Sequence, residues 1–126
     1  MPGKQRILVV EDAFLVAMDL DTLLSSAGYE VVGPVGSVRQ ALGLIDGNPL
    51  DAALLDVNVT DGHVFPAADA LAARHVPFVF LTGHSHSVLP PQHRRCVLIA
   101  KPYSPEALLA ALAAALAGTN GGPPLP

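Results

Sequence analysis

Short apolar runs of strand length alternate along this chain with stretches of helical period, and that alternation constrains the fold more than any other feature. Five runs predict strands: Ile7–Val10, Glu30–Gly33, Asp51–Leu55, Pro77–Leu81 and Cys96–Ala100. The first is uninterrupted and rich in β-branched residues, which is typical of a strand buried on both faces. Neighbouring parallel strands need crossover connections, and helical stretches lie between the runs. The alternation therefore predicts an α/β fold with a doubly wound parallel sheet.

Four segments carry the signals of helices. We expect them at about Ala13–Ala27, behind a capping box at Ser37 and Gln40, at Pro66–Arg74, and after Ser104. In the first helix, apolar residues share one face and Gly28 ends the helix. In the capping box, Ser37 can accept a hydrogen bond from the first turn while Gln40 reaches back toward the cap.

Two parts of the chain carry only weak signals of regular structure. Between Thr82 and Cys96 the helical propensity is low and Pro90-Pro91 would break a longer helix, so we expect a short or irregular fourth helix. From Gly118 onward the chain is rich in Gly, Pro and Asn. We therefore expect one domain over residues 1–117, followed by a flexible tail over 118–126.

Composition excludes several classes of protein. The 126 residues, 51% hydrophobic and 14% charged, fit one compact domain. With a net charge of −4 and no basic cluster beyond Arg94–Arg95, the chain is not expected to bind nucleic acid directly. The single cysteine, Cys96, cannot form an internal disulfide, and no apolar stretch reaches the roughly 20 residues that span a bilayer. We expect a cytoplasmic protein with no membrane contact.

Polar residues stand where the predicted strands end. Glu11 and Asp12 follow the first strand, Asp56 the third, Thr82 the fourth and Lys101 the fifth. In a parallel sheet these ends meet at one edge, where open α/β sheets bind ligands. Two carboxylates about 5 Å apart repel each other by roughly 3 kcal/mol, so Lys101 and a divalent cation are expected to offset them. Oxygen ligands favour Mg²⁺, and the resulting anion site suits a phosphoryl group, with Asp56 as candidate nucleophile.

Four motifs resemble the signature of response-regulator receiver domains of two-component signalling. They are Val9-Val10-Glu11-Asp12, Leu54-Leu55-Asp56-Val57-Asn58, Leu81-Thr82-Gly83 and Lys101-Pro102, in that order. The resemblance covers the chain up to the tail and implies a flavodoxin-like five-stranded sheet of strand order 2-1-3-4-5. Phe80-Leu81-Thr82-Gly83 with Lys101-Pro102-Tyr103 further resembles the stand-alone receivers that carry a Phe-Ala-Thr-Gly-type motif.

This resemblance implies a role for each residue of the site. Asp56 would accept a phosphoryl group from a histidine kinase or a histidine phosphotransfer protein in a phosphorelay. Lys101 and Thr82 would bind the transferred group, and Pro102 would follow a cis peptide bond. Mg²⁺ would be held by Glu11, Asp12, Asp56 and the backbone carbonyl of Asn58.

The expected function is that of a single-domain phosphorylatable switch and not of a metabolic enzyme. Any catalysis would be limited to Mg²⁺-dependent self-phosphorylation and self-dephosphorylation. The switch would signal through contacts with a downstream protein, as a monomer or weak dimer. One position departs from the family pattern, because the residue three before the lysine, aromatic in many receivers, is Leu98. Tyr103, His84 or motion of the fourth-helix segment are the alternative carriers of the signal.

Two other functions stay open. The run Asp56-Val57-Asn58-Val59-Thr60 resembles the Asp-x-Asp-x-Thr motif of haloacid-dehalogenase-like phosphatases. Its second acid is replaced by Asn58, however, and it lies on the third predicted strand where that family uses the first. A pseudo-receiver adaptor would bind partners without phosphate, but its usual sign, the loss of acidic or lysine residues, is not found in the sequence.

The histidines and the cysteine invite a zinc-site interpretation that their spacing does not support. His84, His86, His93 and Cys96 match no standard zinc pattern. We interpret these histidines as solvated loop residues, His63 and His75 as surface or loop residues, and Cys96 as a small buried hydrophobe.

An apolar pair on the first predicted helix has two interpretations. Phe14 and Met18 lie one turn apart, away from the apolar stripe of that helix. They form either the edge of the core or an exposed patch beside the acidic site that docks a kinase helix.

Overall fold

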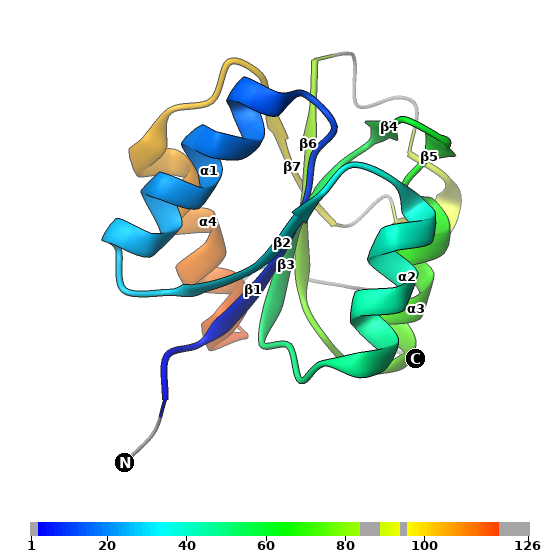
Figure 1. The fold of residues 1–126 in the computed structure, drawn as a ribbon, viewed down its shortest axis with the longest axis horizontal. Coiled ribbons are helices and arrows are strands. Elements are labelled where there is room, and N and C mark those ends of the chain that lie inside the picture. Colours follow the sequence, from blue (N-terminus) through cyan, green and yellow to red (C-terminus); the bar gives the residue numbers. More distant parts are fainter. Residues whose placement is uncertain (1–2, 84–88, 94–95, 119–126) are drawn as a thin grey trace.

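The computed structural model describes residues 3–83, 89–93 and 96–118. Five parallel strands form one sheet in the order β2-β1-β3-β6-β7 (Figure 1). Their bounds are Arg6–Val10 for β1, Glu30–Val35 for β2, Ala52–Asp56 for β3, Phe78–Thr82 for β6 and Val97–Ala100 for β7. Counted along this sheet alone, the order is 2-1-3-4-5, which confirms the predicted flavodoxin-like arrangement.

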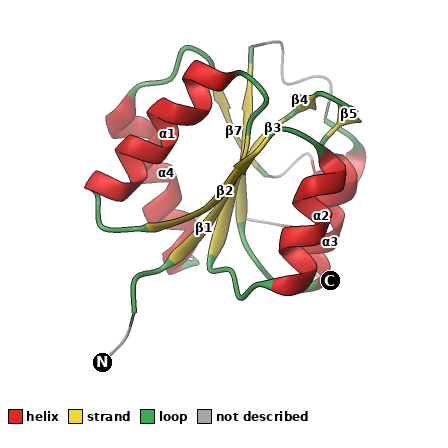
Figure 2. Ribbon diagram, viewed as in Figure 1, coloured by secondary structure: helices red, strands yellow, loops and turns green. Residues whose placement is uncertain are grey.

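Helices cover both faces of the sheet (Figures 1 and 2). One face carries α1 (Phe14–Ser26) and α4 (Pro105–Ala117), and the other carries α2 (Val38–Gly47) and α3 (Phe65–Ala73). Among the residues described, no helix has the length and apolar character needed to cross a membrane.

The connection from β6 to β7 holds a single 3₁₀ turn, Pro91–His93, in its described part. This agrees with the expected short or irregular fourth helix. His84 and His86 lie outside the described residues, as does the part of the expected tail from residue 119 onward.

The core is divided into two layers by the alternation of side chains along each strand. Ile7 and Val9 pack with α1 and α4, whereas Leu8 and Val10 pack with α2 and α3. All five residues of β3 and all five of β6 are buried, as expected for central strands with helices on both sides. The sheet therefore holds its central strand ends in fixed positions at one edge.

Strand β2 is longer than the sequence predicts. It continues through Pro34 to Val35, where the prediction ended it at Gly33. As an edge strand, β2 tolerates a proline without a backbone donor, and its register against β1 shifts between Leu8 and Val10. Gly33 adopts φ of 96°, and a Cβ atom there would lie 3.0 Å from the Val9 carbonyl oxygen, so this irregularity requires glycine.

Other boundaries differ by one residue. The third strand begins at Ala52 and not at Asp51, whose carboxylate accepts a hydrogen bond from the Arg6 backbone N–H at 2.7 Å. The fifth strand begins at Val97 and not at Cys96, and α3 begins at Phe65 instead of at the following proline.

A small hairpin after β3 was not predicted. It consists of β4 (Asn58–Val59) and β5 (Gly62–His63), which pair antiparallel. Each strand has only two residues, too few for an alternating apolar pattern to show in the sequence. The hairpin lies directly beyond Asp56, the last residue of β3.

Candidate functional site

Three carboxylates come together at the carboxyl edge of the sheet. Glu11 and Asp12 follow β1, and Asp56 ends β3. One carboxylate oxygen from each residue lies within 4.8 Å of those from the other two. Glu11 and Asp56 are only 3% and 6% exposed, whereas Asp12 is exposed to solvent. The structure thus places two buried carboxylates and one accessible carboxylate around a common point.

The ammonium group of Lys101 reaches this cluster from β7. Its Nζ atom is 2.5 Å from Glu11 Oε1 and 3.4 Å from Asp56 Oδ2. The Lys101 backbone N–H donates to the Thr82 carbonyl at 2.8 Å, and the Lys101–Pro102 peptide bond is cis, as the resemblance implies. The second oxygen of Glu11 accepts from the Ala13 backbone N–H at 3.1 Å. Lys101 and Glu11 are therefore held by the loops that carry them.

The titration of Asp56 reflects its burial first and its negatively charged neighbour Glu11 second. Burial, followed by the hydrogen bond and the charge of Glu11, raises the pKa of Asp56 from 3.8 to about 7 against the opposing effect of Lys101. Burial by itself would lower the pKa of Lys101, but its contacts with Glu11 and Asp56 raise that pKa above the usual value. One ammonium group does not neutralise the cluster, so additional positive charge at this edge would be favourable.

Thr82 and Asn58 flank the carboxylates. Thr82 ends β6, the strand next to β3, and is buried. In the pairing of these two strands, Asp56 lies opposite Leu81, so Thr82 is one position beyond it. Asn58 is exposed and lies two residues after Asp56, in the hairpin that sequence analysis missed. Both residues lie at the edge where their predicted roles would place them.

The donor set fits a hard divalent cation. The cluster offers carboxylate oxygens only, and Mg²⁺ prefers oxygen ligands while it retains several water molecules. The exposed carboxylate of Asp12 gives a cation access from solvent. Burial and the adjacent Glu11 both disfavour the ionised form of Asp56, and a bound cation would favour that form.

The interpretation of His93 as a solvated loop residue is wrong. Its side chain is 1% exposed, and Nε2 lies 2.8 Å from Asp69 Oδ1 on α3. Its ring centroid lies 5.6 to 6.0 Å from those of Phe65, Phe78 and Phe80. These partners come from distant parts of the chain, so residue spacing could not reveal them. The contact between His93 and Asp69 therefore links the β6–β7 connection to α3.

The other histidine and cysteine interpretations hold where the structure describes the residue. Cys96 is buried, and burial raises the pKa of its thiol to about 11, so it behaves as a small apolar side chain. His63 and His75 are exposed. Leu98, at the position of the usual switch aromatic, is half-buried against the layer that packs under α2 and α3.

The apolar pair on α1 is exposed, so it does not form the edge of the core. Phe14 and Met18 are 73% and 50% exposed, and Leu15, which the sequence analysis did not single out, is 75% exposed. These three residues, which we call the α1 patch, begin two positions after Asp12. An apolar surface therefore adjoins the acidic cluster.

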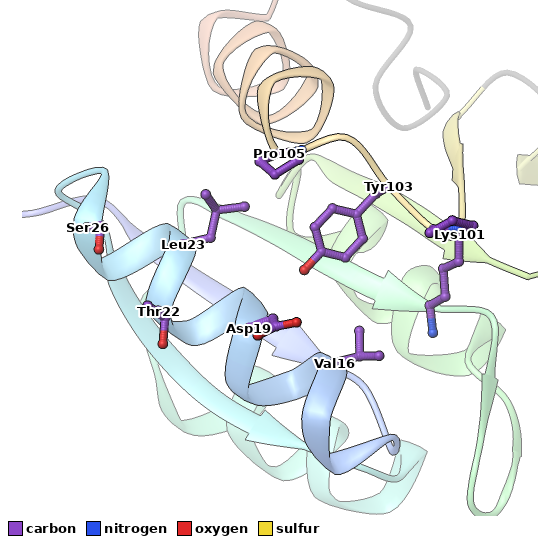
Figure 3. Close-up of a pocket in the computed structure, with 9 residues that line it drawn as sticks. Val16, Asp19, Thr22, Leu23, Ser26, Lys101, Tyr103 and Pro105 are labelled. Carbon is purple, nitrogen blue, oxygen red and sulfur yellow. The ribbon is translucent and has the colours of Figure 1, made fainter.

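A hollow of about 790 Å³ lies between α1 and the β7–α4 connection (Figure 3). Tyr103 projects into it from the connection, with its hydroxyl group turned toward Asp19 of α1. Burial, then the charges of Asp19 and Glu11, raise the pKa of Tyr103. Lys101 and Pro102 also line the hollow, so its wall is continuous with the acidic site.

Comparisons with known proteins agree with this geometry. The family model of the response regulator receiver domain matches residues 7–113. The transcriptional regulatory protein PdtaR of Mycobacterium tuberculosis is 32% identical over 112 residues, which cover 86% of this chain and 55% of that protein. The phyllosphere-induced regulator PhyR of Methylorubrum extorquens is 30% identical over 114 residues, 87% of this chain and 43% of that protein. The chain thus spans about half the length of the curated relatives it matches.

Solved structures give the same result. The solution structure of SdrG from Sphingomonas melonis Fr1 superposes with a TM-score of 0.80 at 40% identity, covering 92% of this chain and 99% of that chain. The BeF3-activated conformation of SdrG gives a TM-score of 0.76 at the same identity and coverage.

Proposed function

The chain belongs to the response regulator receiver domain family, and from this membership we propose that it is a phosphorylatable switch with Asp56 as phosphoacceptor. Receiver domains are signalling switches of two-component systems and not typical enzymes. The observation that carries the proposal is the position of Lys101 Nζ between Glu11 and Asp56, within a cluster of three carboxylates. The phosphoryl donor would be a histidine kinase or a histidine phosphotransfer protein.

The transfer would form one bond and break one. A carboxylate oxygen of Asp56 attacks the phosphorus of a phosphohistidine, and the P–N bond breaks. The imidazole leaves with the electron pair and is protonated from solvent, while Asp56 becomes an acyl phosphate. Asp56 attacks in its ionised form, and its pKa of about 7, raised by burial, leaves much of it protonated near neutrality. Positive charge at the site therefore favours the reactive form.

We propose that Mg²⁺ supplies this positive charge. Glu11, Asp12, Asp56 and the backbone carbonyl of Asn58 would hold it, and when bound it supplies charge that neutralises the phosphoryl oxygens. The close carboxylate oxygens and the accessibility of Asp12 support this assignment.

Lys101 and Thr82 would stabilise the phosphorylated state. Lys101 Nζ is already within 3.4 Å of Asp56, so it can pair with a phosphoryl oxygen placed there. Thr82, on the neighbouring strand, would donate a hydrogen bond from its hydroxyl group to the same phosphoryl group. The hydrogen bond from the Lys101 N–H to the Thr82 carbonyl joins the end of β6 to the residue that follows β7.

The α1 patch supports docking of the phosphoryl donor. Phe14, Leu15 and Met18 lie beside the acidic cluster, and an apolar surface of this kind accepts the face of an amphipathic helix. A donor seated there could present its histidine to Asp56. A downstream protein would then read the phosphorylated state through protein–protein contacts.

Phosphorylation of purified protein tests the proposal. With acetyl phosphate and Mg²⁺, intact-mass spectrometry is expected to record the addition of one phosphoryl group, and beryllofluoride is expected to shift NMR signals near Thr82. Asp56→Asn should abolish both responses. If Asp56→Asn is still phosphorylated, the site assignment is wrong. Steady turnover of generic phosphomonoesters would favour the phosphatase alternative, and partner binding without phosphorylation would favour the pseudo-receiver.

A further inference from the structure

Asp61 lies in the turn between β4 and β5 and is hydrogen-bonded to the first turn of α2. Its Oδ1 accepts from the Val38 N–H at 2.7 Å, and its Oδ2 accepts from the Arg39 N–H at 3.1 Å. These N–H groups belong to the first two residues of the helix and have no acceptor within it. The bonds, that from Val38 above all, lower the pKa of Asp61, so the carboxylate is ionised at neutral pH. Two charge-assisted bonds therefore join the hairpin to α2.

The same turn has a second attachment, to the segment Val35–Ser37, which runs from the last residue of β2 to the N-cap of α2. The Thr60 N–H donates to the Gly36 carbonyl at 3.1 Å. At the N-terminus of α2, Ser37 Oγ accepts from the Gln40 N–H at 3.1 Å, and Gln40 Oε1 accepts from the Gly36 N–H at 3.3 Å. The predicted capping box thus forms at Ser37, with Gln40 reaching one residue further back. It leaves the two preceding helix N–H groups to the hairpin.

This segment also contacts the loop that carries two of the site carboxylates. A Cβ atom on Gly36 would lie 3.2 Å from Asp12 Cα, a tight contact, so the two backbones approach closely. The Glu11 N–H donates to the Val35 carbonyl at 2.8 Å. On its other side the segment holds the hairpin that contains Asn58. It therefore links the two parts of the chain that the magnesium site would require.

We infer that Asp61 is a positioning residue for that site: it fixes the hairpin, and with it the backbone of Asn58, relative to Glu11 and Asp12. The inference rests on the proposed function, because it needs Mg²⁺ to bind at the carboxylates and at the Asn58 carbonyl. A hairpin with only two residues in each strand is weakly ordered by its own backbone pairing. If the metal-ligating carbonyl of Asn58 had to be ordered when Mg²⁺ binds, that ordering would cost affinity. Holding the hairpin in place before Mg²⁺ binds removes this cost.

Magnesium affinity tests the inference directly. The dissociation constant of Mg²⁺ would be measured by calorimetry at neutral pH for the wild type, Asp61→Ala and Asp61→Asn, and the unfolding free energy would be measured by urea titration without Mg²⁺. We expect Asp61→Ala to bind Mg²⁺ about tenfold more weakly, at the low end of the range for groups that orient metal ligands. Asp61→Asn keeps one acceptor oxygen and should lie between Asp61→Ala and the wild type.

Asp51→Ala is the matched control. The Asp51 carboxylate also accepts from a backbone N–H at 2.7 Å, that of Arg6, but at the opposite edge of the sheet. The Asp51→Ala substitution removes the same charge and the same kind of hydrogen bond as Asp61→Ala does, and we expect it to leave the Mg²⁺ affinity unchanged. Equal affinities for Asp61→Ala and Asp51→Ala would overturn the inference, as would a loss explained by the unfolded fraction alone. In either case Mg²⁺ binding and phosphorylation of the wild type would leave the proposed function intact. Failure of the wild type to bind Mg²⁺ would overturn both.

Discussion

Replacing Asp56 by asparagine should stabilise the protein when no metal is bound, although it removes the phosphoacceptor. The carboxyl group is buried beside Glu11, and its pKa rises from 3.8 to about 7 mainly through that burial. Between these two pH values the folded protein retains a proton that the unfolded chain has lost. Stability therefore falls as pH rises across this window, and above about pH 7 the full penalty is present.

The size of the effect follows from the shift. About three pKa units correspond to a ceiling of roughly 4 kcal/mol, at 1.36 kcal/mol per unit. Solvent near the exposed rim of the site screens the interaction, so we expect about 2 kcal/mol. Asp56→Asn has no charge to bury, so its advantage over the wild type should reach this value at pH 8 and vanish near pH 4.

Urea denaturation at several pH values, with a chelator present, measures this difference. Asp46→Asn is the control, because the Asp46 carboxylate is exposed and pairs with the exposed Arg74 at 3.2 Å. It should change the unfolding free energy little at any pH. The reasoning is refuted if Asp56→Asn shows no gain at pH 8, or the same gain at pH 4. Added Mg²⁺ should stabilise the wild type more than Asp56→Asn.

Three further predictions test other contacts. Lys101→Ala should leave calorimetric Mg²⁺ binding intact or tighter, because an ammonium leaves the site, yet shorten the lifetime of the phosphorylated protein. Asp69→Ala removes the acceptor of buried His93 and should lower the unfolding free energy by about 1–3 kcal/mol in urea titrations, more than an exposed substitution on α3 would. Replacing Phe14 and Met18 by serine should slow phosphotransfer from a donor protein, measured with radiolabelled phosphate, while phosphorylation by acetyl phosphate is unchanged.

The positions of the site residues were predictable because each depends on a local pattern. Asp56 directly follows an apolar run, and a residue that ends a strand of a parallel sheet lies at the carboxyl edge. The same holds for Glu11 after β1 and Lys101 after β7. No long-range information is needed beyond the knowledge that the strands are parallel, and the helical stretches between them supply it.

The supporting contacts were not predictable, because they join residues far apart in sequence. Asp61 is 23 and 22 positions away in sequence from Val38 and Arg39, the residues of α2 that it binds. Asp69 is 24 positions away from His93. The capping box at Ser37 accounts for one free N–H of α2 and leaves the first two without a visible acceptor. Water can satisfy such groups at a helix terminus, so nothing in the sequence indicates that a side chain from another loop binds them.

Burial of Glu11 and Asp56 makes the metal-free site unfavourable, and this same property prepares it for its ligands. Lys101 offsets only part of the negative charge, so the pKa of Asp56 stays raised to about 7, chiefly by burial. Above about pH 7, where Asp56 is ionised, a bound cation would offset the charge that burial makes unfavourable, and this would add to the binding free energy. At lower pH the cation would have to displace the proton of Asp56, which would weaken its binding. An exposed cluster would lose this contribution, because water would already stabilise each carboxylate. The proposed site would therefore gain affinity for a divalent cation above about pH 7 at the expense of stability in its absence.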